Sequence, residues 1–192
     1  AQINIPWWRE QSYYDEPGRG TYKRDGGGVL ISQAIHTLDL AISLLGDVKD
    51  VMVIAETTKF HKMESENFVT GGIKFKNSVI ASLFASTSVF PGSSESIVLH
   101  CENATVKLEA GTLIINWRNG KKEEFGEESG TGGSADPMAF PFDWHKDLIY
   151  NFAKSISTNK KFEITGKEAL KVHYLIDAMI ESSKKNKLIT ME

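Results

Sequence analysis

The sequence predicts an α+β domain in which a mostly antiparallel sheet carries helices on one face. Two observations support this fold class: strand-like segments fill the middle of the chain, and helical periodicity marks both ends. With 192 residues, 41% of them hydrophobic, the chain suffices for one core, so a single domain over 1–192 is expected. The uncovered face of the sheet would be available to a partner.

The first periodic segment, DGGGVLISQAIHTLDL (25–40), is predicted to start a helix that continues to Leu45. Its apolar residues recur at spacings of three and four, which is typical of one buried helical face. These residues are Ile31, Ala34, Ile35, Leu38, Ala41, Ile42 and Leu45. Polar residues form a second stripe, made of Ser32, His36, Asp39 and Ser43, with Gln33 beside it.

Within the polar stripe, His36 and Asp39 are the pair best suited to chemistry. A carboxylate one turn beyond an imidazole can accept a ring N–H, fix the tautomer and favour the charged form. Such a histidine is suited to general acid or base catalysis near neutral pH. The alternative is that the two residues share a solvated helix face by chance, and their spacing alone leaves both interpretations open.

Gly26, Gly27 and Gly28 remove every side chain at the start of this helix. Glycine is favoured where another backbone or a ligand comes very close, and helix N-termini also attract phosphate. The segment matches neither G-x-G-x-x-G nor a P-loop, so it is a weak phosphate motif. Close packing and the approach of a ligand therefore both remain open.

The middle of the chain is expected to form an antiparallel meander. Its strand candidates are rich in β-branched and aromatic residues. They span residues 51–58, 68–76, 78–90, 96–100, 105–109, 112–118 and 121–125. Asn77 alone separates the second candidate from the third, and Asn119-Gly120 is a strong hairpin signal between the last two. Connections this short require antiparallel pairing.

Residues 126–142 are rich in Gly, Ser and Pro and are expected to form a long loop of a functional or disordered kind. Two helices are predicted to follow and to pack on the sheet. The first starts near Trp144, and its apolar face is Leu148, Ile149, Phe152 and Ile156. The second covers 166–184 behind a capping box of Thr165 and Glu168. Its stripe is Ala169, Val172, Ile176, Met179 and Ile180.

Composition argues against several classes of protein. The chain has 22 basic and 25 acidic residues without a basic patch, so nucleic acid is not an expected partner. The sequence has no apolar run of roughly 20 residues and no signal peptide, so we expect no membrane segment. We expect a cytoplasmic location. Cys101 is the single cysteine, so no internal disulfide is expected. A metal site is not expected either, because only His36 and Asp39 share a face.

Several motifs together carry a resemblance to a known family. WWREQSYYDEPGRGTY and DGGGVLISQAIHTLDLAISLLGDVKDV contain tandem tyrosines, an Arg-Gly-Thr step, a triple glycine and the His36-to-Asp39 spacing. With HKDLIYNFAKSI and ITGKEALKVHYLIDAMIESSKKNKLI, they resemble the C-terminal domain of the glucose-fructose oxidoreductase, inositol dehydrogenase and MocA family of nicotinamide-dependent oxidoreductases. The resemblance covers nearly the whole chain. It implies that NAD or NADP is bound by an N-terminal Rossmann domain that is missing from this chain.

The resemblance also implies a reaction and a set of site residues. His36 would be the catalytic histidine of a dehydrogenase that oxidises a secondary alcohol of a sugar, cyclitol or nucleotide sugar, together with a lysine from the missing domain. Ser32 stands where several family members carry an aspartate, which leaves the substrate and the proton relay open. The expected substrate contacts are Tyr14, Arg19, Thr21, Gln33, Asp39 and His145. The open sheet face would form a homodimer or homotetramer.

A second function, from another class, is a non-catalytic module that binds a partner or oligomerises through the open sheet face. Both functions require stable folding and self-association. Only the enzyme requires a dinucleotide-binding domain, and only the enzyme would lose turnover on the substitution His36→Ala.

Overall fold

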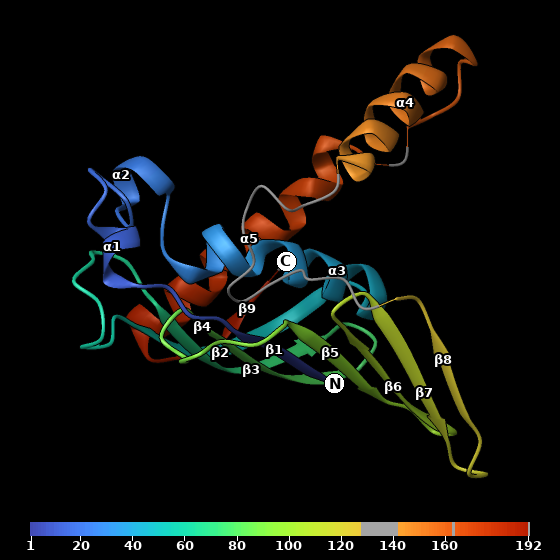
Figure 1. Ribbon diagram of the computed structural model, residues 1–192, viewed down its shortest axis with the longest axis horizontal. Helices are drawn as coiled ribbons and strands as arrows, with labels where there is room; N and C mark the ends of the chain where they lie inside the picture. The colour runs from blue at the N-terminus through green and yellow to red at the C-terminus, as the bar shows by residue number, and fades with distance from the viewer. Residues whose placement is uncertain (128–141, 163, 192) are drawn as a thin grey trace.

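The computed structural model describes residues 1–127, 142–162 and 164–191, which form one nine-stranded sheet with helices on it. The strand order is β8-β7-β6-β5-β1-β4-β3-β2-β9 (Figure 1). The strands are β1 (Gln2–Pro6), β2 (Val48–Glu56), β3 (Phe68–Phe75), β4 (Ile80–Ser86), β5 (Ser96–His100), β6 (Ala104–Glu109), β7 (Thr112–Trp117), β8 (Lys122–Phe125) and β9 (Ile189–Thr190). Neighbouring strands pair antiparallel except β1 and β4, which run parallel. The mostly antiparallel sheet predicted from the sequence is therefore confirmed.

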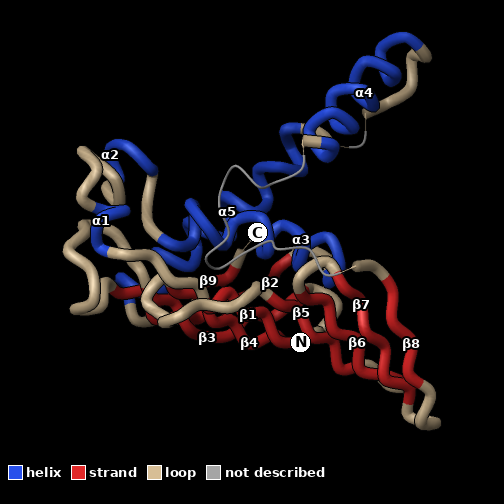
Figure 2. Tube along the Cα trace, viewed as in Figure 1, coloured by secondary structure: helices blue, strands red, loops and turns tan. Residues whose placement is uncertain are grey.

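The helices gather on one side of the sheet, as Figures 1 and 2 show. They are α1 (Gln11–Tyr14), α2 (Tyr22–Asp25), η1 (Leu30–Ala34), α3 (Ile35–Leu45), α4 (Asp143–Ser157) and α5 (Gly166–Lys185). The helices α3 and α5 contact each other and lie across the sheet. The short helices α1 and α2 cover one end, whereas α4 projects away from the body. The predicted α+β class, with helices on one face, is confirmed.

The core lies between the sheet and the helices α3 and α5. Ile3 and Ile5 of β1, Val51 of β2 and Leu38 of α3 are each 0% exposed. Burying one such aliphatic side chain contributes roughly 1.5–3 kcal/mol, so this layer supplies most of the driving force for folding. None of the described helices lies on the other face of the sheet, where Met52 is 53% exposed.

The strand β1 was not expected from the sequence, yet it lies in the middle of the sheet. It pairs with β4 on one side and with β5 on the other. Its five residues, QINIP, are too few for a convincing alternation. The partners of β1 lie about 80 and 95 residues further along the chain, as in the pairs Ile3–Leu83 and Ile3–Ile97, so only the tertiary structure reveals this strand.

The helix predicted to follow the glycines begins with the π-helical turn η1 and continues as α3. A π turn takes in one residue more than an α turn, and such turns are frequent at functional sites. The predicted buried stripe faces the core, with Leu38 at 0% and Ala41 at 1% exposure. The predicted polar stripe, Ser32, His36, Asp39 and Ser43, is exposed.

The last two helices have the predicted bounds to within two residues, but they differ in burial. In α5, Val172, Ile176 and Met179 are buried, while Ala169 near its start is exposed. Thr165 caps α5 by accepting a hydrogen bond from the Glu168 N–H at 3.3 Å. No residue of α4 is buried by the described part of the chain. The expectation that both helices pack on the sheet therefore holds for α5 and is wrong for α4.

Two further expectations concern a loop and a membrane segment. Of the predicted loop over 126–142, residues 128–141 lie outside the described residues. Among the described residues, the segment Tyr22–Leu45 is long and apolar enough to cross a membrane, with a mean hydropathy of 1.5. A buried core helix passes the same test, and 56% of this window is buried inside the domain. Its hydropathy is therefore accounted for by its packing against the sheet.

Candidate functional site

His36 lies in the first turn of α3 at the edge of a surface hollow of about 220 Å³. The hollow forms where α3, the start of β5, the turn between β6 and β7 and the first turn of α4 come together. Its lining includes Thr37, Leu40, Glu95, Ser96, Glu109 and Trp144. His36 is exposed, so the fold presents its side chain to solvent instead of to the core.

The hollow combines hydrogen-bonding groups with an aromatic ring. Glu95 accepts a hydrogen bond from Trp7 Nε1 at 3.2 Å, which holds its carboxylate in place. Glu109 pairs with Lys107 Nζ at 2.6 Å. With the ring of Trp144 on one side, these groups suit a ligand that carries both hydroxyl groups and a carbon skeleton.

Asp39 lies one turn beyond His36, and both side chains are exposed on the same face of α3. In the described part of the chain, no hydrogen bond joins the His36 ring to the Asp39 carboxylate. The role of Asp39 in orienting the imidazole therefore stays a prediction.

The glycines before η1 have structural causes. Gly26 is the left-handed C-cap of α2, with φ of +81°. A Cβ atom on Gly28 would lie 1.8 Å from the carbonyl oxygen of Glu66 and 2.9 Å from its carboxyl carbon. Of the two interpretations left open by the sequence, close packing explains Gly28, and its neighbour is Glu66.

Glu66 occupies the start of the helix that carries His36. Its carboxylate accepts hydrogen bonds from the Gly28 N–H, at 3.2 Å to each oxygen, and from the Leu30 N–H at 3.1 Å. Glu66 is 4% exposed, and burial raises the pKa of its carboxyl, while the N–H groups of Leu30 and Gly28 act in the opposite direction. The amides that would cradle a phosphate are thus already occupied. The diphosphate of a dinucleotide therefore does not fit at this helix start.

Two predicted substrate contacts, Tyr14 and Thr21, hold the fold together in this structure. Tyr14 is 8% exposed, and its hydroxyl shares a 2.7 Å hydrogen bond with Thr87. Burial raises the pKa of Tyr14 to about 12. Thr21 caps α2, accepting from the Arg24 N–H at 3.3 Å and donating to the Gly18 carbonyl at 2.7 Å. Neither residue lines the hollow beside His36.

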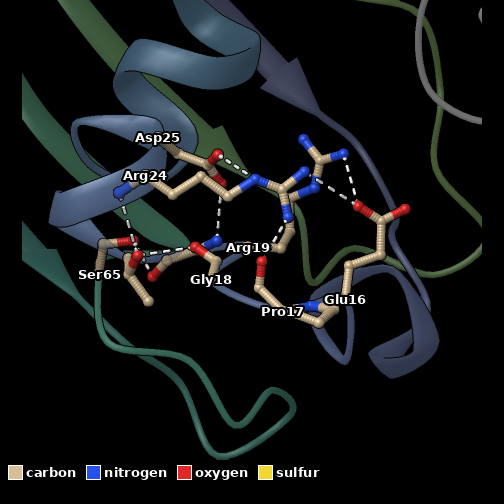
Figure 3. A network of polar contacts seen from close by, with 9 residues as sticks. Glu16, Pro17, Gly18, Arg19, Arg24, Asp25 and Ser65 are labelled. Carbon is tan, nitrogen blue, oxygen red and sulfur yellow. Dashed lines mark hydrogen bonds and ion pairs between the residues drawn. The ribbon is translucent and has the colours of Figure 1, made fainter.

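Arg19 belongs to a polar network around α1 and α2, shown in Figure 3. Its guanidinium donates to Glu16 at 3.0 Å and lies 4.6 Å from the centre of the Tyr13 ring. Arg24 donates to the same Glu16 oxygen at 3.2 Å, and the two arginines lower the pKa of Glu16. Arg19 Nε is buried without a hydrogen-bond partner among the described residues. The predicted contact of Arg19 with an anionic group therefore stays a prediction, at a place outside the hollow.

Gln33 and His145 complete the predicted set. Gln33 lies in η1 and is 6% exposed. His145 lies in the first turn of α4 and is exposed, next to Trp144, which lines the hollow. The structure thus brings His36 and the start of α4 together, and it leaves Tyr14, Arg19 and Thr21 outside that hollow.

The sequence did not indicate three of the residues that shape this site. Glu95 and Glu109 belong to turn and strand segments without a motif, and Glu66 stands in the polar stretch ESEN before β3. An acidic residue two positions before a strand is the only sequence signal that Glu66 offers. Among the described residues, no three His, Cys, Asp or Glu side chains are grouped so as to hold a metal ion.

A family profile described as the GFO/IDH/MocA C-terminal domain matches residues 1–107. A protein of Saccharomyces cerevisiae, "Uncharacterized protein YMR315W", is 26% identical over 171 residues, which are 83% of this chain and 47% of that protein. The chain therefore spans about half the length of that relative.

Solved structures match the fold over the whole chain. The WlbA dehydrogenase from Bordetella pertussis, in complex with NADH and UDP-GlcNAcA, has a TM-score of 0.76 at 22% identity, covering 100% of this chain and 53% of that one. A levoglucosan dehydrogenase, in complex with NADH and levoglucosan, has a TM-score of 0.79 at 15% identity, covering 100% and 57%. At these identities the likeness establishes the fold.

Proposed function

Because this chain belongs to the GFO/IDH/MocA family through its C-terminal domain, we propose that it is the substrate side of a nicotinamide-dependent oxidoreductase. In this proposal a separate dinucleotide-binding domain of the same protein holds NAD or NADP. Two observations support it: the helix start that could bind phosphate is filled by Glu66, and the matched solved chains are nearly twice as long. The WlbA and levoglucosan dehydrogenase structures contain NADH, which is consistent with the proposal.

The observation that carries the proposal is the exposed His36 at the edge of the hollow. Its imidazole would take the hydroxyl proton of a secondary alcohol as the C–H bond of the same carbon breaks. The bound nicotinamide supplies the hydride acceptor. Positioned proton transfer of this kind contributes roughly 10²- to 10⁴-fold in rate.

The substrate class follows from the lining of the hollow. Its volume of about 220 Å³ is below the roughly 300–1,000 Å³ of a complete ligand pocket, so this chain supplies one wall of the site. Glu95 and Glu109 accept hydrogen bonds from hydroxyl groups and disfavour a second negative charge. A neutral sugar ring or cyclitol is therefore the favoured reacting group, and a nucleotide-sugar uronate is the alternative.

The test replaces His36 in the natural full-length protein. Sugars, cyclitols and nucleotide-sugar uronates are screened with NAD⁺ and with NADP⁺, following reduced nicotinamide at 340 nm. His36→Ala is expected to lower kcat by about 10²- to 10⁴-fold with an unchanged circular dichroism spectrum, because the side chain is exposed. The matched control is Ser43→Ala, two turns further along the same polar stripe. Wild-type turnover in His36→Ala would remove His36 from the mechanism.

The open face of the sheet supports a second part of the proposal, self-association. Met52 and Ile54 of β2 and Ile80 of β4 are 53%, 58% and 69% exposed on the sheet face that none of the described helices covers. Covering such apolar side chains stabilises an interface. We place the contact of a homodimer or homotetramer there. The same face would serve a non-catalytic binding module, so turnover separates the two functions.

A further inference from the structure

We propose that Glu66 is a positioning residue for His36: it holds the start of the helix that carries the imidazole. This inference rests on the proposed function of His36. Glu66 lies two residues before β3 and is not among the residues that line the hollow beside His36. It would therefore act on the reaction through the backbone.

One residue satisfies three consecutive backbone donors at the start of η1. The carboxylate of Glu66 accepts from the Gly28 N–H and the Leu30 N–H, and its main-chain carbonyl accepts from the Val29 N–H at 2.8 Å. The first N–H groups of a helix have no partner inside the helix. Val29 is the N-cap residue, and its side chain makes no capping hydrogen bond. Glu66 thus supplies the hydrogen-bond acceptors that a capping side chain next to the helix supplies in other helices.

The contact is close as well as polar. Gly28 approaches the Glu66 backbone so tightly that a Cβ atom would lie 1.8 Å from its carbonyl oxygen. Glu66 is itself followed by the fully buried Asn67, whose side chain bonds the Thr58 N–H at 2.7 Å and His61 Nδ1 at 2.7 Å. Glu66 is therefore held by a rigid neighbour, and the helix start is fixed relative to the sheet.

His36 lies six residues beyond Leu30, within the second turn after this attachment. The intervening turn η1 is a π turn, a rare arrangement that occurs mostly as a single turn within α-helices. In this proposal, releasing its first residues would let η1 shift toward the commoner α geometry. Because a displacement of about 1 Å can lower a rate by about 10²-fold, the attachment at Glu66 matters for His36.

The charge of Glu66 also suits this place. A negative charge is stabilised at a helix N-terminus by the helix dipole. Lys184 of α5 lines the same cavity as Glu66, and its charge opposes the rise in the pKa of Glu66 that burial causes. Tyr22 of α2 lines this cavity too, and burial, together with the negative charges of Glu66 and Glu64, raises the pKa of Tyr22. Glu64 lines the same polar cavity as Glu66 but is exposed.

The test compares Glu66→Ala, Glu66→Gln and the control Glu64→Gln in the full-length protein. Kinetics use the substrate found in the screen, and hydrogen exchange of the Gly28 and Leu30 amides and the NMR signal of the His36 ring are measured in parallel. Glu66→Ala is expected to lower kcat by about 10²-fold with KM within about twofold. Glu66→Gln, which keeps one carbonyl acceptor, is expected to recover about tenfold of this loss. Glu64→Gln should match the wild type in every measurement.

The outcomes separate this inference from the proposed function. If His36→Ala abolishes turnover while both Glu66 variants keep wild-type kcat, the inference is wrong and the role of His36 stands. If hydrogen exchange accelerates equally throughout the protein instead of mainly at the helix start, Glu66 is only a stabilising residue, and the inference is also wrong. If Glu66→Ala does not fold, the test uses Glu66→Gln. A shifted NMR signal of the His36 ring in Glu66→Gln, with wild-type hydrogen exchange in β3, supports positioning. An unshifted signal contradicts it. If His36→Ala keeps wild-type turnover, the proposed role of His36 fails, and positioning by Glu66 fails with it. If the full-length protein turns over none of the screened alcohols, the proposed function itself fails.

Discussion

The helices α3 and α4 carry apolar stripes of the same kind, yet one stripe is buried and the other is exposed. Leu38 of α3 is 0% exposed, whereas Ile149 and Phe152 of α4 are 69% and 50% exposed. The sheet lies opposite α3, and no described element covers α4 (Figure 1). Periodicity therefore predicts a helix and its apolar face, but burial requires a second surface that periodicity does not contain.

The largest expected effect tests this contrast directly. Leu38→Ala should lower the free energy of unfolding by about 2–5 kcal/mol, because it leaves a cavity in the core. Leu148→Ala in α4, where the side chain is 41% exposed, should cost about 0.5 kcal/mol or less. Urea unfolding followed by circular dichroism measures both. Equal losses would mean that α4 is covered in solution.

The second prediction concerns Tyr14, which is buried like the α3 stripe, and Tyr150 of α4, which is 63% exposed. The folded-state pKa of Tyr14, about 12, lies above its ordinary value of 10.0. Tyr14 therefore adds stability that is complete below pH 10 and is lost as the pH rises toward 12, by about 3 kcal/mol.

Unfolding of Tyr14→Phe measured from pH 8 to pH 12 should show a smaller alkaline loss of stability than the wild type. At neutral pH the variant should lose about 1 kcal/mol, since the hydrogen bond to Thr87 is removed. Tyr150→Phe is the matched control at an exposed ring. An alkaline slope that Tyr14→Phe leaves unchanged would place Tyr14 in contact with solvent.

The smallest effect on stability is expected on the open sheet face, the other apolar surface without a cover. Ile54→Lys should change the free energy of unfolding by about 0.5 kcal/mol or less, because the side chain is 58% exposed. Ile54→Lys should nevertheless lower the molecular mass measured by light scattering from that of a dimer or tetramer to that of a monomer. Ile149→Lys on α4 is the control. If Ile149→Lys dissociates the oligomer and Ile54→Lys does not, the interface lies on α4 and not on the open sheet face.

The site shows the same division between local and tertiary information. His36 and Asp39 were identified from their helical spacing, and the structure places both on the exposed face of α3. The resemblance implies Tyr14 and Thr21 as substrate contacts, and in this structure Tyr14 is a core residue and Thr21 is a helix cap, so the substrate contact stays a prediction. The cap at Thr21 is local, because Gly18 and Arg24 each lie three residues away. The burial of Tyr14 depends on tertiary structure, because its partner Thr87 lies 73 residues away.

The sequence by itself determined the local features of this protein. It predicted the helix behind the glycines, the meander with its Asn119-Gly120 hairpin, and the capping of α5 by Thr165. These depend on hydrogen bonds and side-chain spacing within a few residues. Local interactions of this kind can be read in a short window.

The tertiary structure alone decided which surfaces meet. It placed β1 between β4 and β5, left α4 uncovered by the described residues, and brought Glu66 to the Gly28 N–H from 38 residues away. The physical reason is that burial and buried hydrogen bonds are properties of two opposed segments. A pattern within one segment predicts its apolar face and its hydrogen-bonding groups, and the tertiary structure determines which other segment contacts them.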